Sequence, residues 1–182
     1  MTVRALLAVT CLLIAAPAAA QDGIHSDAFV DQIGAIQSAV VVQSGAASAE
    51  IRQDGKFQRA RVKQTAGPAG QIKLTLDMRG IGNDAVVTQS GVAVAGVQMA
   101  GVGNQAFLTQ RGGIGADANV IALLQSGTRN YASLTQNGSG NAIDLAQHNS
   151  DNSATITQNG NNLGIKMVQD GGAKAVVVQT GK

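Results

Sequence analysis

The sequence is poor in large aromatic side chains and in charge. Among 182 residues there is no Trp, one Tyr and three Phe, and Asp, Glu, Lys and Arg together make up 13%. That charged share is about half of the usual value for a soluble domain, whereas disordered chains are normally highly charged. Ala and Val dominate the apolar residues, and the 23 glycines follow no collagen period. These absences exclude an aromatic-rich core, a charged disordered chain and a collagen, and they favour a thin, repetitive architecture of small residues.

The single cysteine, Cys11, lies in an N-terminal segment with the features of a secretory signal peptide. Arg4 supplies a positive charge, residues 5–16 form an apolar run, and small residues form a cleavage site before Gln21. The run is shorter than the roughly 20 residues that span a bilayer. We therefore predict that residues 1–20 are removed and that the secreted chain has no disulfide or thiol chemistry. The alternative is a lipoprotein signal acylated on Cys11.

The remaining chain repeats the tripeptide Gln-x-Gly. From Gln125 onwards, successive glutamines are 11, 11, 11, 11 and 10 residues apart, a regularity typical of a solenoid or stacked array. An Asn often lies six residues before the Gln, with small or aliphatic residues at alternate positions between them, as in residues 130–136 and 152–158. A period of two over seven residues, closed by Gly or Asn, predicts a β-strand followed by a tight turn.

Charge is confined to one face of these predicted strands. We align twelve segments on the Gln, Gln98 included, and add a thirteenth, residues 72–78, which lacks it. The parity of the Gln carries no charge. One buried and one solvated face require such a pattern, whereas a helical period would mix the two sets. The opposite parity carries eleven charged residues: Glu50, Arg52, Arg59, Arg61, Lys63, Lys73, Asp77, Asp84, Asp144, Lys166 and Lys174.

Glutamine and asparagine on the buried face need hydrogen-bond partners, because a buried amide costs free energy unless it is paired. Strands stacked about 4.8 Å apart allow each amide to bond the identical amide above and below it, which forms a ladder. The alternative is that each Gln ends its strand and faces solvent at the turn. The expected ladder comprises Gln89, Gln110, Gln125, Gln136, Gln147, Gln158, Gln169, Gln179, Asn83, Asn104, Asn119, Asn130, Asn141 and Asn152. The expected turn glycines are Gly91, Gly112, Gly127, Gly138, Gly160 and Gly171.

This repeat resembles that of the curlins, the repeat subunits of bacterial curli amyloid fibres. The curlin motif has Gln, four residues, Asn, five residues and Gln, usually with Gly-x-Gly-Asn in the turn. The spacing is matched by residues 125–136, 136–147 and 147–158. The turn is matched by residues 80–83, 101–104 and 138–141. The resemblance covers residues 37–182, is most specific over 119–158 and is looser before Asn83.

The resemblance implies an all-β fold, a β-solenoid of stacked two-strand rungs with amyloid-like cross-β geometry and about 11 residues per half-repeat. Thirteen half-repeats would give six to seven rungs, a body about 30 Å long. We divide the chain into a signal peptide, residues 1–20, an N-terminal segment, residues 21–36, and a repeat domain, residues 37–182. The repeat domain is less regular over 37–82 and regular over 83–182.

The resemblance also implies a structural subunit of extracellular curli-type amyloid fibres, without enzymatic activity, cofactor or metal. Uncapped strand edges would template head-to-tail addition, which does not close and therefore produces a filament. Such a subunit would pass through the periplasm to the cell surface and serve the biofilm matrix and cell adhesion. Its implied partners are copies of itself, another curlin subunit as nucleator or fibre partner, and an outer-membrane curli export channel with its accessory proteins.

Several interpretations stay open. Residues 21–36 hold three Asp and no Lys or Arg, and they form an export address, a disordered tail or a cap on the first rung. A basic run either binds anionic polysaccharide or extracellular DNA, or forms a solvated face that discourages wrong edge pairing. That run comprises Arg52, Lys56, Arg59, Arg61 and Lys63. His148 is expected to be a solvated turn residue. The competing function is a monomeric secreted β-helical binding module for carbohydrate or another surface.

Overall fold

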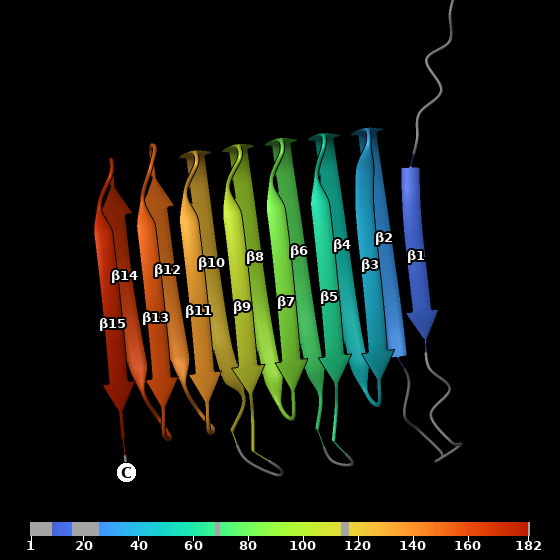
Figure 1. Ribbon diagram of the computed structural model, residues 1–182. Coiled ribbons are helices and arrows are strands. Elements are labelled where there is room, and N and C mark those ends of the chain that lie inside the picture. The colour runs from blue at the N-terminus through green and yellow to red at the C-terminus, as the bar shows by residue number, and fades with distance from the viewer. Residues whose placement is uncertain (1–8, 16–25, 68–69, 114–116, 182) are drawn as a thin grey trace, which may run out of the picture.

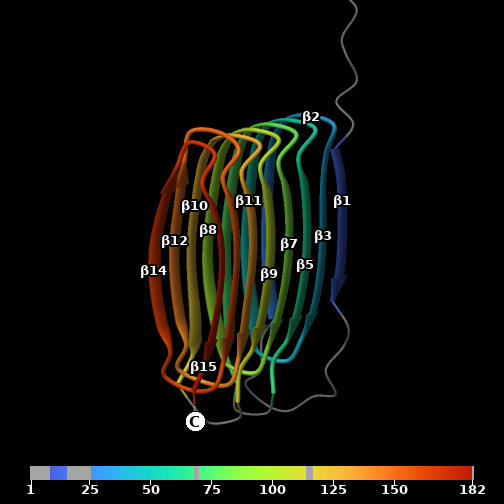
Figure 2. The ribbon, with the colours of Figure 1, turned by 60° about the vertical axis from the view of Figure 1, so that its left-hand side comes forward.

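The computed structural model describes residues 9–15, 26–67, 70–113 and 117–181. These residues form fifteen strands and no helix (Figure 1). Accordingly, this part of the chain contains no helix that is long and apolar enough to cross a membrane. The strands lie in two sheets that face each other, and the chain crosses from one sheet to the other after nearly every strand (Figure 2).

Sheet A contains the eight odd-numbered strands in sequence order. They are β1 (Val9–Ala15), β3 (Gln37–Ser44), β5 (Arg59–Thr65), β7 (Asp84–Ser90), β9 (Gln105–Arg111), β11 (Tyr131–Asn137), β13 (Ser153–Asn159) and β15 (Lys174–Thr180). Sheet B contains the seven even-numbered strands in the same order. They are β2 (Ser26–Ala35), β4 (Ala47–Lys56), β6 (Ile72–Ile81), β8 (Ala93–Val102), β10 (Asn119–Thr128), β12 (Ala142–His148) and β14 (Gly164–Asp170).

Each even-numbered strand and the odd-numbered strand that follows it form one rung, so β2–β15 make seven rungs. Every strand pair is parallel and in register, as where β11 places Gln136 opposite Gln158 of β13. The predicted all-β solenoid of two-strand rungs is therefore confirmed. Its thirteen expected half-repeats correspond to β3–β15, and the less regular residues 37–82 supply β3–β6 of the same two sheets. At about 4.8 Å per rung the stack is about 34 Å long.

The core lies between the two sheets and is built from small and aliphatic residues. Alanine repeats at one buried position of sheet A, and Val, Leu or Ile repeats two residues later, as in Ala132 and Leu134, which are both 0% exposed. No charged residue is buried among the described residues. The eleven charged residues assigned to the outward parity are all exposed or half-buried, so the predicted two-faced strand pattern is confirmed.

The alignment of Gln98 on the buried parity is wrong. In β8 it is Met99 that is buried, opposite Met78 of β6 and Gln125 of β10, while Gln98 faces solvent. The register is set by the corner glycine near the end of most even strands, because Gly101 stacks on its counterparts in the neighbouring rungs. Since the inward residue lies two positions before that glycine, β8 presents a thioether where other even strands present an amide.

Two segments outside the predicted repeat also form strands. Residues 26–35 form β2, which pairs with β4 and begins sheet B. Residues 9–15, inside the predicted signal peptide, form β1, which pairs in parallel with β3. The predicted cleavage site at residues 17–20 lies outside the described residues. The signal peptide and the export address therefore remain predictions.

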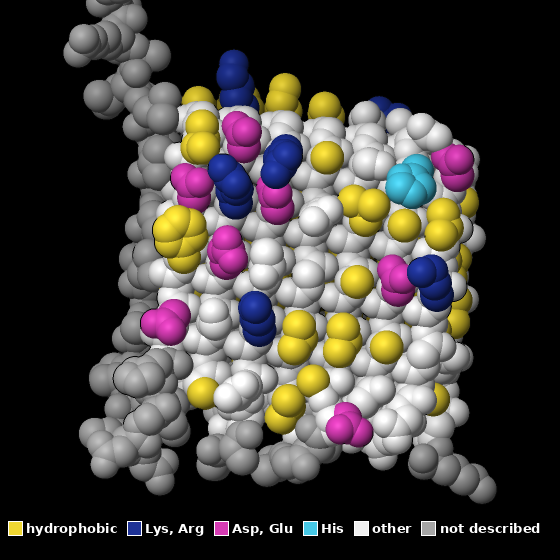
Figure 3. All heavy atoms as spheres, turned by 180° about the vertical axis from the view of Figure 1, so that it is seen from behind, with side chains coloured by type: hydrophobic (Ala, Val, Ile, Leu, Met, Phe, Trp, Pro, Cys, Tyr) yellow, Lys and Arg dark blue, Asp and Glu magenta, His cyan; other side chains and the backbone are white. Residues whose placement is uncertain are grey.

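The outer face of sheet B carries charges of both signs, intermixed over the first rungs and sparse over the later ones (Figure 3). Arg52 lies 3.6 Å from Asp31 on the neighbouring strand β2, and Lys166 lies 2.9 Å from Asp144 on β12. Both pairs are exposed, so each stabilises the fold only weakly. The charges keep this face solvated, although it also carries exposed apolar residues, among them Phe29, Val120 and Val168.

Candidate functional site

The candidate site is the set of buried amides that runs along the stack. On sheet A one glutamine per strand points inward, and each Nε2 donates to the Oε1 of the glutamine in the next rung. The successive Nε2···Oε1 distances are 2.8 Å for Gln43–Gln64, 2.9 Å for Gln64–Gln89, 2.9 Å for Gln89–Gln110, 3.0 Å for Gln110–Gln136, 3.0 Å for Gln136–Gln158 and 2.9 Å for Gln158–Gln179. The column spans the whole stack without interruption, and all of its amides point the same way.

Each glutamine of this column also connects the two sheets. The Nε2 of Gln136 donates its second hydrogen to the carbonyl of Val120 on sheet B at 3.1 Å. Gln89 makes the same kind of bond to Lys73, and Gln158 to Ala142. Because donors and acceptor are all paired, burial of these amides costs little. The column therefore fixes the register along the stack and the distance between the sheets.

The glutamine column of sheet B is interrupted. Gln32 donates to Gln53 at 2.6 Å, but the next two rungs present Met78 and Met99, which are both buried. The column resumes at Gln125, which donates to Gln147 at 2.9 Å, and Gln147 donates to Gln169 at 2.7 Å. The Oε1 of Gln125 is buried without a hydrogen-bond partner among the described residues, because the preceding rung offers no donor.

Most bonds of the buried asparagines differ from the expected ladder of identical amides. Each Oδ1 accepts a backbone N–H of the next rung, usually that of the equivalent asparagine, as from Asn104 to Asn83 at 3.1 Å. Each Nδ2 donates to backbone carbonyls, and that of Asn104 reaches Ala100 and Gly127, both at 3.1 Å. One amide-to-amide bond also forms, from Nδ2 of Asn152 to Oδ1 of Asn130 at 3.0 Å. The same bond from backbone N–H to Oδ1 joins Asn130 to Asn104, Asn141 to Asn119 and Asn152 to Asn130. These residues therefore fasten the chain corners to one another.

Two positions of this asparagine column were not predicted from the sequence, because they are occupied by glutamine. Gln37 and Gln58 lie six residues before Gln43 and Gln64, and that spacing is the signal that identifies them. The Nε2 of Gln58 donates to Asp54 at 2.6 Å and to Gly80 at 3.2 Å, as the asparagines do. The longer side chain misplaces the oxygen, and Oε1 of both Gln37 and Gln58 is buried without a partner among the described residues.

Replacing Gln58 with Asn is expected to stabilise the protein. The shorter side chain places its Oδ1 where it accepts the backbone N–H of Asn83, and this satisfies a buried acceptor worth about 1 kcal/mol. The urea midpoint of unfolding measures the change. Gln71→Asn is the matched control, because Gln71 is exposed and its replacement leaves the midpoint unchanged. A lower midpoint for Gln58→Asn would contradict the assignment of this position to the asparagine column.

The six predicted turn glycines all lie at or near the ends of strands. Five of them have positive φ, namely Gly91 (79°), Gly127 (116°), Gly138 (110°), Gly160 (129°) and Gly171 (60°). Gly112 does not, but a Cβ there would lie 2.5 Å from the carbonyl oxygen of Val92. Close approach of backbones at the corners, as well as φ, therefore requires these glycines.

The basic run that was considered for polyanion binding does not form one patch. Arg52 lies on sheet B, whereas Arg59, Arg61 and Lys63 lie on sheet A. Arg59 forms an ion pair with Asp84, with 2.5 Å between Nη2 and Oδ2, and this pair raises the pKa of Arg59. Of this basic run, only Arg61 and Lys63 remain as neighbouring basic side chains on one face that an extended polyanion could contact.

Nearer the C-terminal end of the stack, Arg129, which follows β10, and Asp151, which follows β12, form an exposed bidentate ion pair with both N···O distances at 2.8 Å. The hydrogen bonds from Arg129 lower the pKa of Asp151. Any stabilisation from this pair is therefore lost as the pH falls through the lowered pKa. Near it, His148 ends β12, half-buried, with its Nδ1 at 3.0 Å from Oγ of Ser126.

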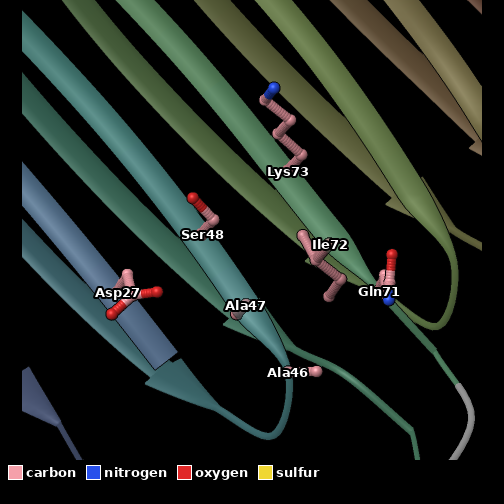
Figure 4. Close-up of a pocket in the computed structure, with 7 residues that line it drawn as sticks. All are labelled: Asp27, Ala46, Ala47, Ser48, Gln71, Ile72 and Lys73. Atoms are coloured by element: carbon pink, nitrogen blue, oxygen red, sulfur yellow. The ribbon is translucent and has the colours of Figure 1, made fainter. Parts of the chain in front are cut away.

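The hollows on the surface do not gather reactive side chains. One of about 290 Å³ lies over the start of β2, β4 and β6 and is lined by Asp27, Ser48 and Lys73 on successive strands, with Ala46, Ala47, Gln71 and Ile72 (Figure 4). Across the ranges that the structure describes, no three His, Cys, Asp or Glu residues gather as a metal site would require. The distinctive chemical feature of the described structure is therefore the set of hydrogen-bonded amides inside the stack.

Comparison with known proteins gives one family. Residues 116–148 match the family model of the curlin associated repeat. The matched segment covers β10, β11 and β12, where both glutamine columns and the buried asparagines are present. No curated protein matches the chain, and no solved structure matches it.

Proposed function

We propose that this chain, of which residues 116–148 match the curlin associated repeat, is a structural subunit of an extracellular curli-type amyloid fibre. Copies add head-to-tail through the open ends of the solenoid, without a catalytic step. The fibre contributes to a biofilm matrix and to cell adhesion, after export through the periplasm and an outer-membrane channel. Another curlin subunit serves as nucleator or fibre partner.

The observation that carries this proposal is the open edge at the C-terminal end of the stack. Among the described strands, β15 has a single neighbour, β13, and β14 has a single neighbour, β12. The outward valines of β15 are 79% exposed at Val176 and 65% exposed at Val178. An open, flat, apolar edge strand is a template for pairing with another chain.

The parallel arrangement of the sheets supports a filament as the product. All strands of a sheet run in one direction. The two ends of the stack therefore present different strands, but both strands have the same orientation and can pair in parallel with another copy. Contact between unlike ends of identical copies is heterologous, and without a closing rotation it repeats indefinitely. The buried amide columns give each added copy a defined register, because an unpaired buried amide is costly.

A thioflavin T time course on residues 21–182, freshly released from denaturant, tests this function. We expect a lag, then growth, and fibre diffraction of the product at about 4.8 and 10 Å. A chain that instead folds to a stable soluble monomer, with no growth over days, would contradict the proposal. That outcome would favour a monomeric β-helical binding module.

A further inference from the structure

The first and last strands of the repeat domain on sheet A carry the same five residues. Residues 39–43 of β3 and 175–179 of β15 both read Ala-Val-Val-Val-Gln. Among the strands between them, β7 differs at one position, Thr88, and the others differ at more. Only β3 and β15 place Val at both outward positions of this segment. The two ends of the stack are therefore more alike than either is to the strand beside it.

Alternate residues of β15 have backbone N–H and C=O groups that no described strand pairs with, and these groups can bond a further strand. Ala173 accepts from the N–H of Ser153 at 2.8 Å, and Gly181 donates to Asn159 at 2.9 Å. Residues in a parallel strand turn alternately toward one neighbour and the other. Odd-numbered residues of β15 therefore face β13, and the even-numbered residues of 174–180 point their N–H and C=O groups away from the stack.

The backbone of β3 is complementary to that of β15. Ser38 donates to Gln58 at 2.9 Å, and Ser44 accepts from Ala66 at 2.8 Å. Even-numbered residues of β3 therefore face β5, and the odd-numbered residues of 37–43 face outward. When Gln179 of one copy lies opposite Gln43 of another, the outward groups of the two strands fall in the phase that parallel pairing requires.

The amide columns continue in this same register. Gln179 accepts from Gln158 at 2.9 Å, and among the described residues its own Nε2 reaches only the carbonyl of Gly164, at 3.4 Å. Its second amide hydrogen is thus placed to meet Gln43 of the next copy. On sheet B the same step places Gln169 over Gln32, whose Oε1 is buried without a partner among the described residues.

The charges of the two end rungs also suit this contact. The first strand of sheet B, β2, carries Asp27 and Asp31 and no basic residue. The last rung carries Lys166 and Lys174 against a single acidic residue, Asp170. Opposite net charge on the two ends favours the encounter of unlike ends over that of like ends.

We propose that β15 of one copy docks on β3 of a second copy with their Ala-Val-Val-Val-Gln segments in register, while β14 docks on β2. The proposal rests on the fibre function above and specifies its joint. The structure already shows a parallel strand on this edge, because β1 pairs with β3 with residue 14 opposite Val42 and residue 15 opposite Gln43. Those are the positions that Val178 and Gln179 of the second copy would take. Since an edge bonds one strand at a time, β1 and the second copy exclude each other.

Disulfide trapping in fibres tests the register. Residues 21–182 retain β2–β15, which supply every buried residue of the described core, and they contain no cysteine. Adjacent in-register strands place their Cα atoms about 4.8 Å apart, within the roughly 4.4–6.8 Å that a disulfide spans. The Val42→Cys, Val178→Cys double variant is expected to form fibres that, after mild oxidation, give a ladder of covalent oligomers on non-reducing gels. Val40→Cys with Val178→Cys, two residues out of register, is expected to give at least about ten-fold less cross-linking.

Two further samples separate the possible failures. Thr157→Cys with Val178→Cys pairs neighbouring strands within one chain and gives an internal disulfide without a ladder. A mixture of the Val42→Cys and Val178→Cys single variants gives dimers and nothing longer. Fibres that form without dimers or ladder would overturn the register and leave the fibre function standing. Absence of fibres from the unsubstituted chain would overturn both.

The competition between β1 and a second copy for the edge of β3 is tested by comparing the full chain with residues 21–182. The full chain, which keeps β1 on β3, is expected to elongate from preformed fibre seeds at least about ten times more slowly than residues 21–182, because β1 must first leave the edge. Equal elongation rates for the two chains would overturn the competition between β1 and a second copy.

Discussion

Replacing Gly101 with Ala is expected to destabilise the protein by at least about 3 kcal/mol. Gly101 lies next to the end of β8, at a corner, with φ of 119°, a conformation that other residues adopt only with strain. A Cβ there would lie 1.9 Å from the carbonyl oxygen of Gly127 in the next rung. That oxygen belongs to the backbone and also accepts from Nδ2 of Asn104, so it cannot move without breaking the asparagine column.

Gly96→Ala is the control for Gly101→Ala. Gly96 lies in the middle of the same strand, points outward and has no positive φ, and a Cβ added there would meet no atom within 4 Å. Its replacement is expected to be neutral or slightly stabilising, because Ala lowers the entropy of the unfolded chain. Urea midpoints of the two variants, measured against the unsubstituted protein, check the prediction. Similar midpoints for both variants would show that the corners tolerate separation of the rungs.

The fold could be predicted from the sequence because its signal is repeated many times. A period of two with charge on one parity indicates a two-faced strand even when single segments are irregular. Residues 72–78 and the basic strand β5 illustrate this, since neither carries the full motif and both lie in register. The strand β2 was missed as a rung because one Gln without the preceding Asn is too little signal.

The error at Gln98 shows which feature sets the register. Spacing between glutamines placed Gln98 inside, yet the structure buries Met99. Backbone atoms of successive corners approach within contact distance at Gly80, Gly101 and Gly127, so a shift of one residue would bring a side chain into that contact. The glycine was therefore the better reference point for alignment. A buried Met in place of Gln interrupts one amide column and gives up the bond to sheet A that Gln53 and Gln125 make.

The bonding of the asparagines could not be predicted from identities alone. An amide on the buried face needs partners, but its sequence does not say whether these are other amides or backbone groups. Asparagine is one methylene shorter than glutamine, which keeps its Oδ1 beside its own backbone and within reach of the next N–H. The partnerless oxygens of Gln37 and Gln58 show the consequence of the extra methylene. The basic run was likewise misleading, because the chain turns at Phe57 (φ 57°) and divides the run between two sheets.

The two glutamine columns differ in how strongly assembly is expected to depend on them, because that of sheet A is continuous and that of sheet B is interrupted. The interruption in sheet B leaves the acceptor of Gln125 unpaired among the described residues, and a flexible Met fills the gap. Glutamines of both columns bond across to the other sheet, as Gln125 does to Gln105, but only the column of sheet A joins every strand of its sheet from β3 to β15 without a break. We therefore expect sheet A to be the more sensitive of the two.

Replacing Gln136 with Ala is expected to cost about 3 kcal/mol and to slow fibre formation. Gln136 is 0% exposed, accepts from Gln110 at 3.0 Å and donates to Gln158 at 3.0 Å and to Val120 at 3.1 Å. Alanine leaves a cavity and removes the donor from two buried acceptors. Asn141→Ala is expected to act in the same direction, since it removes the bonds from Nδ2 to Asn137 and Gly160.

The control for Gln136→Ala is the same substitution at Gln98, which faces solvent and whose loss is expected to change stability by no more than about 0.5 kcal/mol. Urea midpoints and thioflavin T growth curves are measured on both variants and on the unsubstituted chain. A lower midpoint and slower growth for Gln136→Ala alone would tie fibre formation to the buried column. Unchanged growth for Gln136→Ala would remove the amide ladder from the mechanism of assembly, because copies would then register through backbone pairing and valine packing alone.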